Sequence, residues 1–148
     1  MERKKAIIVD IDGTLADIDH RVHHIQKDTK DWKSFNDEMG GDKLNPWCKD
    51  LIIAMKKQGN LIILLTGRDV EHKNHTQTWL KDNQVPYDYL FMRRLGDMRE
   101  DDVVKEEIFL QEIKEQFQIL FVVEDRLKVV KKWRELGIVC LQCDWGDF

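Results

Sequence analysis

Three continuously apolar runs constrain the fold of this chain more than any other feature of its sequence. They are Ile7–Val9, Leu61–Leu65 and Leu120–Val123. Apolar runs without polar alternation are typical of strands that are covered on both faces, as in parallel sheets. Segments with helical periodicity separate the runs, and strands that alternate with helices indicate an α/β architecture. The sequence therefore predicts a central, mostly parallel sheet with helices on both faces.

The same patterns predict where the individual elements lie. The five strand candidates are Ala6–Asp10, Leu61–Thr66, Tyr89–Met92, Ile119–Glu124 and Ile138–Gln142. The four helix candidates are Pro46–Gln58, Val70–Asn83, Asp102–Phe117 and Leu127–Leu136. Gly59 and Gly137 follow two of these helical stretches, and glycine suits the C-terminal cap of a helix.

One segment breaks this rhythm, because about thirty residues between Thr14 and Asn45 show no strand pattern. A connection of this length is too long for an ordinary loop, so we expect a small helical cap insertion at about residues 16–45. The whole chain has 148 residues, which suits one domain with a substantial core. We therefore expect a single domain over residues 1–148.

Composition and charge exclude several classes of protein. No apolar run is long enough to span a bilayer, and the basic N-terminus leads into a core strand rather than a signal peptide. A net charge of −4 argues against a protein that coats nucleic acid, which is usually basic. Cys48, Cys140 and Cys143 offer no four-ligand zinc set and are expected to be reduced thiols. We therefore expect a cytoplasmic protein with no membrane partner.

The first predicted strand runs into Asp10-Ile11-Asp12-Gly13-Thr14, which suits Mg²⁺-dependent phosphoryl transfer. A strand that enters a tight turn directs one carboxylate and one main-chain carbonyl at the same point, and Mg²⁺ prefers oxygen ligands. Asp10 can attack phosphorus as a nucleophile, and Asp12 can move protons as a general acid and base. The alternative is an ordinary strand-end turn, since Asp and Gly are common turn residues.

Polar residues also follow the later strands, whose carboxyl ends are where open α/β sheets bind ligands. Thr66-Gly67-Arg68 follows the second strand and offers a hydroxyl, an open N–H and a guanidinium to phosphate oxygens. Glu124-Asp125-Arg126 follows the fourth strand, where Asp125 suits a third Mg²⁺ carboxylate and Glu124 suits a metal-bound water. The alternatives are a strand-to-helix turn, a helix-start acid pair, and a surface ion pair of Arg68 with Asp69 or Glu71.

Lys105 lies early in a predicted helix, near the positive end of the helix dipole. A lysine gains no support from the dipole there, so a role facing a bound phosphate is one interpretation. The alternative is a solvated lysine among the neighbouring acids Asp101, Asp102, Glu106 and Glu107.

Two groups of residues in or next to the insertion favour structural interpretations. The histidines lack the Cys or carboxylate pattern that completes a zinc site; they are His20, His23 and His24. The aromatic residues are large enough to stack on a base, but packing of the insertion on the core is the favoured interpretation. These residues are Trp32, Phe35 and Trp47.

The order of these blocks resembles the haloacid dehalogenase superfamily of phosphatases, which have a Rossmann-like fold. The matching blocks are Asp10–Thr14, Thr66–Arg68, Lys105 and Glu124-Asp125. A closer likeness is to the 3′-phosphatase domain of phage-type polynucleotide kinase/phosphatase. The residues that carry it are Gly96–Arg99, Asp101–Phe109, Glu124–Arg126 and Trp145–Phe148.

The resemblance implies a role for each matched residue. Asp10 would be the nucleophile and a Mg²⁺ ligand, and Asp12 would be the general acid and base that gives its main-chain carbonyl to Mg²⁺. Thr66 and Lys105 would hold the transferring phosphoryl group, and Asp125 would complete the metal site. Glu124 stands where related domains often carry Asp, which suggests an outer-shell role. Residues implied near the substrate phosphate or the acids are Arg21, Gly67, Arg68, Arg93, Arg99 and Arg126.

The function implied by the resemblance is a Mg²⁺-dependent polynucleotide 3′-phosphatase. It would remove the 3′-terminal phosphate, with a 2′,3′-cyclic phosphate as a second candidate substrate, from DNA or RNA ends through an aspartyl-phosphate. A separate 5′-kinase and a ligase are expected partners in end healing, in the host cytoplasm if a phage encodes the chain. The alternatives are a phosphatase of small substrates such as nucleotides or sugar phosphates, and a non-catalytic scaffold.

Overall fold

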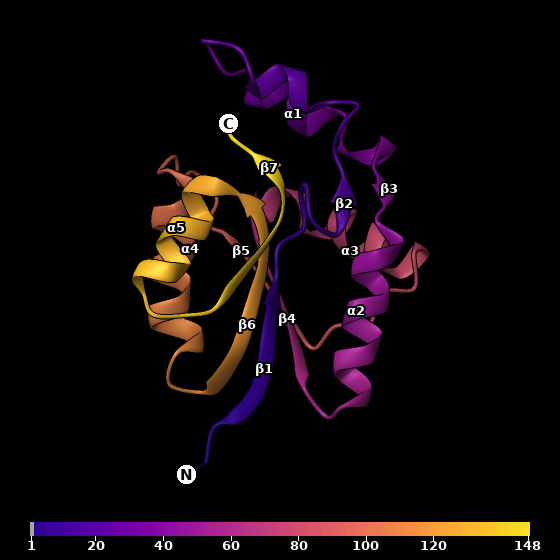
Figure 1. Cartoon of the computed structure of the whole chain (residues 1–148). Coiled ribbons are helices and arrows are strands. Elements are labelled where there is room, and N and C mark those ends of the chain that lie inside the picture. The colour runs from indigo at the N-terminus through magenta and orange to yellow at the C-terminus, as the bar shows by residue number, and fades with distance from the viewer. Residues whose placement is uncertain (1) are drawn as a thin grey trace.

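A five-stranded parallel sheet forms the centre of this computed structural model, which describes residues 2–148 (Figure 1). The strand order is β5-β4-β1-β6-β7, and every neighbouring pair is parallel. The expected α/β architecture is thus confirmed, and each expected strand is present. The bounds are β1 Lys4–Val9, β4 Leu61–Asp69, β5 Tyr89–Arg93, β6 Phe117–Arg126 and β7 Cys140–Gly146.

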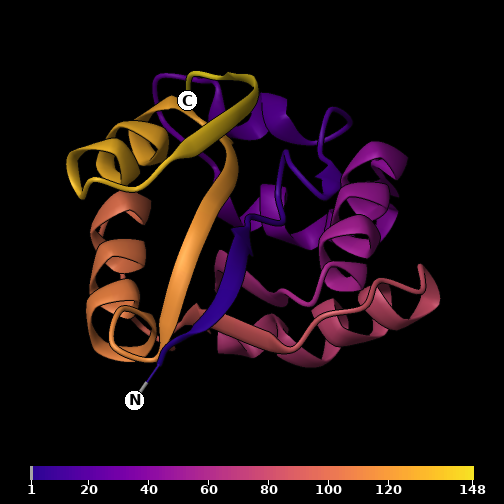
Figure 2. The ribbon, with the colours of Figure 1, turned by 60° about the horizontal axis from the view of Figure 1, so that its bottom comes forward.

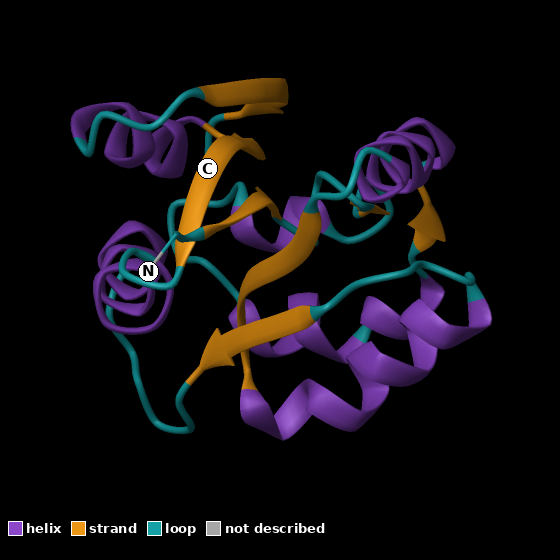
Figure 3. Ribbon diagram, turned by 90° about the horizontal axis from the view of Figure 1, so that it is seen from below, coloured by secondary structure: helices purple, strands orange, loops and turns teal. Residues whose placement is uncertain are grey.

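Helices cover both faces of the sheet (Figure 2, Figure 3). On one face lie α2 (Pro46–Lys57) and α3 (Lys73–Asp82). On the other face lie α4 (Asp101–Ile108) and α5 (Leu127–Glu135). A π-helical turn at Phe109–Ile113 follows α4, so the single long helix expected in this region is two helical forms in succession.

The central strand β1 shows how the sheet buries both of its faces. Ile7 and Val9 pack into the cluster under α2 and α3, whereas Ala6 and Ile8 pack into the cluster on the opposite face. The side chains alternate because successive residues of a strand point to opposite faces. Burial of a large aliphatic side chain contributes about 1.5–3 kcal/mol, so β1 is firmly held. Asp10, the next residue, is therefore held in a fixed place at the carboxyl edge of the sheet.

The cap insertion lies above the carboxyl ends of the strands (Figure 1). It contains α1 (Trp32–Asp37), two 3₁₀ turns and a two-stranded antiparallel sheet of β2 (Ala16–Asp17) and β3 (Lys43–Leu44). The sequence does not predict these strands, because two residues are too few to produce an alternating pattern. A small core of its own stabilises the insertion, formed by Ile18, Ile25 and Phe35.

Two further sequence expectations can be compared with the fold. Gly59 and Gly137 follow α2 and the C-terminal end of α5 with φ angles of +86° and +79°, the left-handed conformation that glycine adopts at helix ends. Within residues 2–148, no helix is both long and apolar enough to cross a membrane.

Candidate active site

The carboxyl ends of β1, β4 and β6 meet beneath the cap insertion and line a cavity of about 290 Å³. Asp10 and Asp12 follow β1, Arg68 belongs to β4, and Glu124 and Asp125 belong to β6. The cap insertion contributes another part of the lining, through Ile25, Lys30, Trp32, Phe35 and Asn36. Segments far apart in the sequence thus meet where α/β sheets bind their ligands.

Three buried carboxylates lie together at this edge of the sheet. Oxygen atoms of Asp10, Glu124 and Asp125 all lie within 4.8 Å of one another. The Nζ of Lys105 donates to Asp10 Oδ1 at 2.8 Å and to Glu124 Oε2 at 2.9 Å. Lys105 is itself buried, so it is not the solvated lysine of the alternative interpretation. We call these four residues the acid cluster.

The acid cluster would carry more negative charge than Lys105 can neutralise if all three of its acids were ionised. Burial, together with the charge of Asp10, raises the pKa of Glu124 well above its ordinary value. Burial and the nearby Asp10 also raise the pKa of Asp125 to about 8. Burial alone would lower the pKa of Lys105, but the carboxylates of Asp10 and Glu124 raise it well above its ordinary value. The shifts indicate that the three acids repel one another.

This surplus of buried oxygen ligands and negative charge fits a divalent cation. Hard cations such as Mg²⁺ take carboxylate and carbonyl oxygens as ligands. A cation next to Asp10 and Asp125 would offset the repulsion and burial that raise the pKa of Asp125. The residues present therefore suit a divalent metal held by oxygen.

The turn after β1 places Thr14 between two of the acids. Its Oγ1 lies 3.3 Å from Asp10 Oδ2 and 3.3 Å from Asp125 Oδ1. Gly13 has a φ of +83°, and a Cβ at this position would lie 2.1 Å from Asp125 Oδ2. Glycine is required here because the backbone is left-handed and the neighbouring carboxylate leaves no room for a side chain. The sequence indicates this tight turn, but it does not indicate the contact of Thr14 with the acids.

Asp12 lies in a different environment, between two buried arginines. Its Oδ1 accepts from Arg21 Nη2 and from Arg68 Nη2, each at 2.6 Å. Arg21 also donates to both oxygens of the buried Asp42, at 2.7 and 2.6 Å, and Arg68 donates to Asp42 Oδ2 at 3.2 Å. We call these four residues the arginine clamp. Arg68 is buried within it and does not form the surface pair with Asp69 that was the alternative.

The arginine clamp favours the ionised form of Asp12. Burial alone would raise the pKa of Asp12, but the charges of Arg68 and Arg21 and their hydrogen bonds hold it well below its ordinary value. Sequence reasoning missed Asp42, which lies inside the cap insertion, far from Asp12 along the chain and in no recognisable motif. Its partners become apparent only when the insertion folds over the sheet.

The end of β4 is held by contacts within its own turn and with α4. Thr66 Oγ1 accepts from the N–H of Arg68 at 3.1 Å. A Cβ on Gly67 would lie 1.9 Å from Asp101 Oδ1, so glycine is what lets β4 approach the start of α4. Asp101 is a second residue that sequence reasoning missed as part of the site, because it looks like one of several helix-start acids.

Three other arginines of interest lie around the cavity. Arg93 donates to Asp101 Oδ1 at 2.9 Å, and Arg126 Nη1 lies 3.5 Å from Asp101 Oδ2. Arg99 is more exposed and pairs with Asp97 at 2.7 Å. Contact of these three arginines with a substrate phosphate stays a prediction.

The arrangement of these groups agrees with a comparison against known protein families. Residues 4–148 match the family model of the polynucleotide kinase PNKP phosphatase domain. The chain belongs to this family. The PNKP phosphatase domain is of the haloacid dehalogenase type, so the chain is a phosphatase domain of that type.

Individual relatives of this PNKP-type chain include longer proteins. A chain of the Pnkp1/Rnl/Hen1 complex is 34% identical with a TM-score of 0.86, and the match covers 100% of this chain and 48% of that one. A protein of Autographa californica nuclear polyhedrosis virus, described as a bifunctional polynucleotide kinase/RNA ligase, is 27% identical over 139 residues. That match covers 90% of this chain and 18% of the viral protein. The chain therefore spans less than half the length of these two relatives.

A more distant structure supports the fold alone. A protein of Clostridium difficile described as a phosphatase is 15% identical to this chain, with a TM-score of 0.64. The match covers 96% of this chain and 86% of that protein. The α/β architecture is therefore shared well beyond the PNKP-type relatives.

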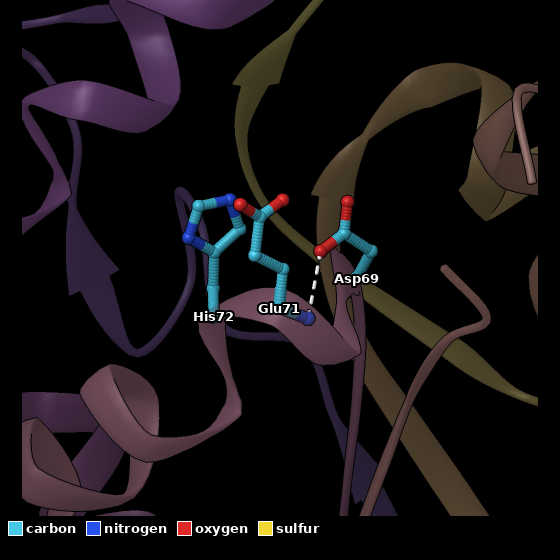
Figure 4. A group of neighbouring side chains, drawn as sticks. All are labelled: Asp69, Glu71 and His72. Atoms are coloured by element: carbon cyan, nitrogen blue, oxygen red, sulfur yellow. Dashed lines mark hydrogen bonds between the residues drawn. The ribbon is translucent and has the colours of Figure 1, made fainter. Parts of the chain in front are cut away.

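A second group of carboxylate and imidazole side chains lies where β4 ends (Figure 4). Asp69, Glu71 and His72 bring ligand atoms within 4.8 Å of one another, but Glu71 is exposed and the other two are half-buried. Asp69 Oδ1 accepts from the Glu71 N–H at 2.9 Å and so caps the 3₁₀ turn Val70–His72. This turn accounts for the proximity of the three residues, and we assign no metal to them.

The histidines of the cap insertion lie against acids. His20 Nε2 is 2.7 Å from Asp42 Oδ1, and His24 Nε2 is 3.0 Å from Glu38 Oε1. The ring centroids of His23 and His24 are 4.0 Å apart. These contacts agree with the structural interpretation of the cluster.

The three aromatic residues considered for packing differ in their surroundings. Phe35 is 3% exposed and packs in the cap insertion, as expected. Trp32 and Trp47 are 41% and 46% exposed, so the rest of the chain covers only part of each residue. The sequence pattern shows that these side chains are apolar, but it does not show how much of each ring the rest of the chain covers.

Proposed function

We propose that this chain removes the 3′-terminal phosphate from nucleic-acid ends with Mg²⁺, through an aspartyl-phosphate intermediate. The observation that carries the proposal is the pairing of two unlike acids beside one cavity. Asp10 belongs to the acid cluster with Lys105, and Asp12 belongs to the arginine clamp. Membership of the PNKP phosphatase family supports the choice of a nucleic-acid substrate.

In the first displacement, a carboxylate oxygen of Asp10 forms a bond to phosphorus, and the bond between phosphorus and the leaving 3′ oxygen breaks. Lys105, which lies 2.8 Å from Asp10, would balance charge on the phosphoryl oxygens, with Thr66 as a hydrogen-bond donor. The leaving oxygen takes its proton from Asp12. Because the arginine clamp favours the carboxylate of Asp12, supplying this proton is the demanding part of the step.

In the second displacement, water attacks phosphorus and the bond between phosphorus and Asp10 breaks. Asp12 takes a proton from that water, inorganic phosphate leaves, and the Asp10 carboxylate is restored. The arginine clamp favours this step, because Arg21 and Arg68 hold Asp12 ionised and oriented at 2.6 Å. The clamp thus suits Asp12 to act as the base that activates water.

Asp10, Asp125 and the main-chain carbonyl of Asp12 would hold Mg²⁺, with Glu124 in the outer shell. The bound cation would supply positive charge to the phosphoryl oxygens. Thr14 would keep Asp10 and Asp125 in position through its hydroxyl, which lies 3.3 Å from each.

The proposal includes a place in nucleic-acid end healing, with residues 1–148 acting as one domain and residues of about 16–45 as its cap. One similar chain comes from the Pnkp1/Rnl/Hen1 RNA repair complex, and another relative is described as a polynucleotide kinase/RNA ligase. A 5′-kinase and a ligase would be the partners of this phosphatase.

Phosphate release from a matched set of substrates tests the proposal. The set comprises a 3′-phosphorylated oligonucleotide, its 5′-phosphorylated counterpart and nucleoside monophosphates, each assayed with Mg²⁺ and with a chelator. We expect Mg²⁺-dependent release from the 3′-phosphorylated end above all. Preference for free mononucleotides would indicate a small-substrate phosphatase instead, and no release from any phosphoester would indicate a scaffold.

DNA and RNA versions of the same oligonucleotide show whether the enzyme prefers deoxyribose or ribose at the 3′ end. A ribose oligonucleotide that ends in a 2′,3′-cyclic phosphate tests whether the ring is opened before phosphate is released. Phosphate from the cyclic end is expected only if Asp12 can protonate a leaving 2′ oxygen as well as a leaving 3′ oxygen.

A further inference from the structure

We propose that the exposed ring of Trp32 stacks on the terminal nucleobase of the bound 3′ end. The inference rests on the proposed function and deepens it, because it names what recognises the nucleoside that carries the phosphate. The cap insertion would then select a nucleic-acid end through one aromatic side chain, while the acids at the sheet edge perform the chemistry.

The cavity offers two chemically different sets of lining groups. Acids and arginines of the strand ends form one set, which suits a phosphoryl group. Apolar side chains form another, and these are Ile25, Trp32, Phe35, Met98 and Phe148. A nucleotide needs both, since its phosphate requires charge and its base binds through flat apolar contact. A bare phosphate or a small polar phosphoester would leave the apolar part of the cavity unused.

Trp32 is held in place by its own helix and yet remains open to the cavity. Asp31 caps α1 by accepting from the N–H of Ser34 at 3.0 Å, which makes Trp32 the first helical residue. The Trp32 ring meets the buried ring of Phe35 edge-on, with centroids 5.6 Å apart. Trp32 itself is 41% exposed. A large ring that is already positioned loses little conformational entropy when a base stacks on it.

Cations lie beside this ring. Lys30 Nζ is 5.8 Å and Arg126 Cζ is 5.7 Å from the centroid of the Trp32 ring. Arg126 also lies 5.0 Å from the centroid of the Phe148 ring and donates through Nε to the main-chain oxygen of Phe148 at 2.7 Å. The whole chain has a net charge of −4, so a polyanion needs local cations of this kind to approach. Aromatic surface next to positive charge is the combination that binds single-stranded nucleic acid.

Trp47 provides a matched control within the same chain. It is 46% exposed, which is close to the value for Trp32. It belongs to α2 and does not line the cavity of Trp32, but a separate one whose lining includes Trp145, Asp17 and Asp144. The lining of that second cavity has acids but no lysine or arginine, which makes it a poor site for nucleic acid.

Two oligonucleotides separate base stacking from phosphate chemistry. Both carry a 3′-phosphate, but one ends in a normal nucleoside and the other ends in an abasic sugar. We expect the wild-type kcat/KM to be about tenfold higher for the normal end, equivalent to ~1.4 kcal/mol and within the range of base–aromatic stacking. Trp32→Leu should bring this ratio close to one, mainly through KM, and Trp32→Phe should keep most of it. Trp47→Leu should leave the ratio unchanged.

Several results would overturn the inference. One is a wild-type ratio near one, which needs no variant to be measured. Another is a tenfold ratio that survives in Trp32→Leu or that disappears in Trp47→Leu. Circular dichroism and thermal unfolding show whether Trp32→Leu is folded, and Trp32→Gln replaces it if it is not. Failure of the proposed function would look different, because the wild type would then hydrolyse mononucleotides and neither oligonucleotide.

Discussion

Two carboxylates that are two residues apart in the sequence occupy opposite electrostatic environments. Asp12 lies in the arginine clamp, where two acids meet two arginines and its pKa is held well below the ordinary value, chiefly by Arg68 and Arg21 against the effect of burial. Asp10 lies in the acid cluster, where three acids meet one lysine. The first group has as many arginines as acids, whereas the second has more acids than cations, so a bound cation can offset the repulsion between its carboxylates when they ionise.

The difference between the two groups follows from the elements that each acid faces. Asp10 directly follows β1 and contacts Lys105 of α4. Asp12 lies in the turn and contacts Arg21 of the cap insertion and Arg68 of β4. One short motif therefore places Asp10 where the metal and the nucleophile are proposed, and Asp12 where two arginines favour its ionised form. In the proposed reaction the cap insertion contributes directly to the chemistry, because half of the clamp comes from it.

Removal of the proposed nucleophile should have the largest effect on activity. In Asp10→Asn we expect kcat to fall at least about a thousandfold, as for the loss of other catalytic nucleophiles. The metal-free variant should unfold at a higher temperature than the wild type, because one of three crowded carboxylates has become neutral. Phosphate-release and thermal-unfolding assays measure the two effects. Substantial activity in this variant would exclude Asp10 as the nucleophile, and exposed Asp144→Asn serves as the control.

Removal of the lysine should make the acid cluster still less balanced. Lys105→Met leaves the buried acids without their cation, which should destabilise the protein by about 3–5 kcal/mol in denaturant unfolding. It should also lower kcat by about 10²–10³-fold through lost charge stabilisation. Lys128→Met, which breaks a more exposed pair with Glu100, should cost no more than about 1 kcal/mol. Equal effects of the two substitutions would argue against a special role for Lys105.

Removal of one clamp arginine should make Asp12 more like an ordinary aspartate. Arg68→Gln removes one of two guanidiniums that lower the pKa of Asp12, so this pKa should rise by about 1 unit or more. Asp12 must be ionised to activate water, so the acidic limb of the kcat–pH profile should move to higher pH. Profiles of the wild type and of Arg134→Gln, which does not contact Asp12, provide the reference. An unchanged acidic limb would show that Arg68 does not control the ionisation of Asp12.

The smallest expected effect concerns pH and metal at the acid cluster. In the folded metal-free protein, burial and then Asp10 raise the pKa of Asp125 from 3.8 to about 8, so the folded chain keeps a proton that the unfolded chain loses. The unfolded state thus binds fewer protons between these pH values, and stability falls as pH rises through this window. Mg²⁺ requires the ionised carboxylate and should offset this loss.

Thermal unfolding with Mg²⁺ and with chelator, at constant ionic strength, measures this linkage. The Tm increase caused by Mg²⁺ should be about 2–4 °C larger at pH 8 than at pH 6, which corresponds to roughly 1 kcal/mol. In Asp125→Asn the pH dependence of the increase should disappear. An increase that is equal at both pH values in the wild type would show that Asp125 does not titrate with metal binding.

The sequence predicted the elements most reliably where a strand is buried on both faces of the sheet. The runs around Ile7–Val9 and Leu61–Leu65 are buried on both faces, so their apolar pattern is unbroken and their ends can be located. The cap insertion was harder, because β2 and β3 have two residues each and α1 has six. Elements this short depend on tertiary contacts rather than on a repeating pattern.

The sequence by itself determined which residues gather at the carboxyl edge of the sheet. Asp10, Thr66 and Asp125 follow from knowing where parallel strands end, because those ends all lie on one side. Only the tertiary structure decided which charges meet there. Asp42 and Asp101 have no motif, and their importance depends on distances between segments far apart in the chain. Each acid near the β1 turn is either paired with arginines, like Asp12, or crowded by other acids, like Asp10. Which of the two it becomes depends on the buried charges within a few ångströms of it, and only the folded chain sets their number.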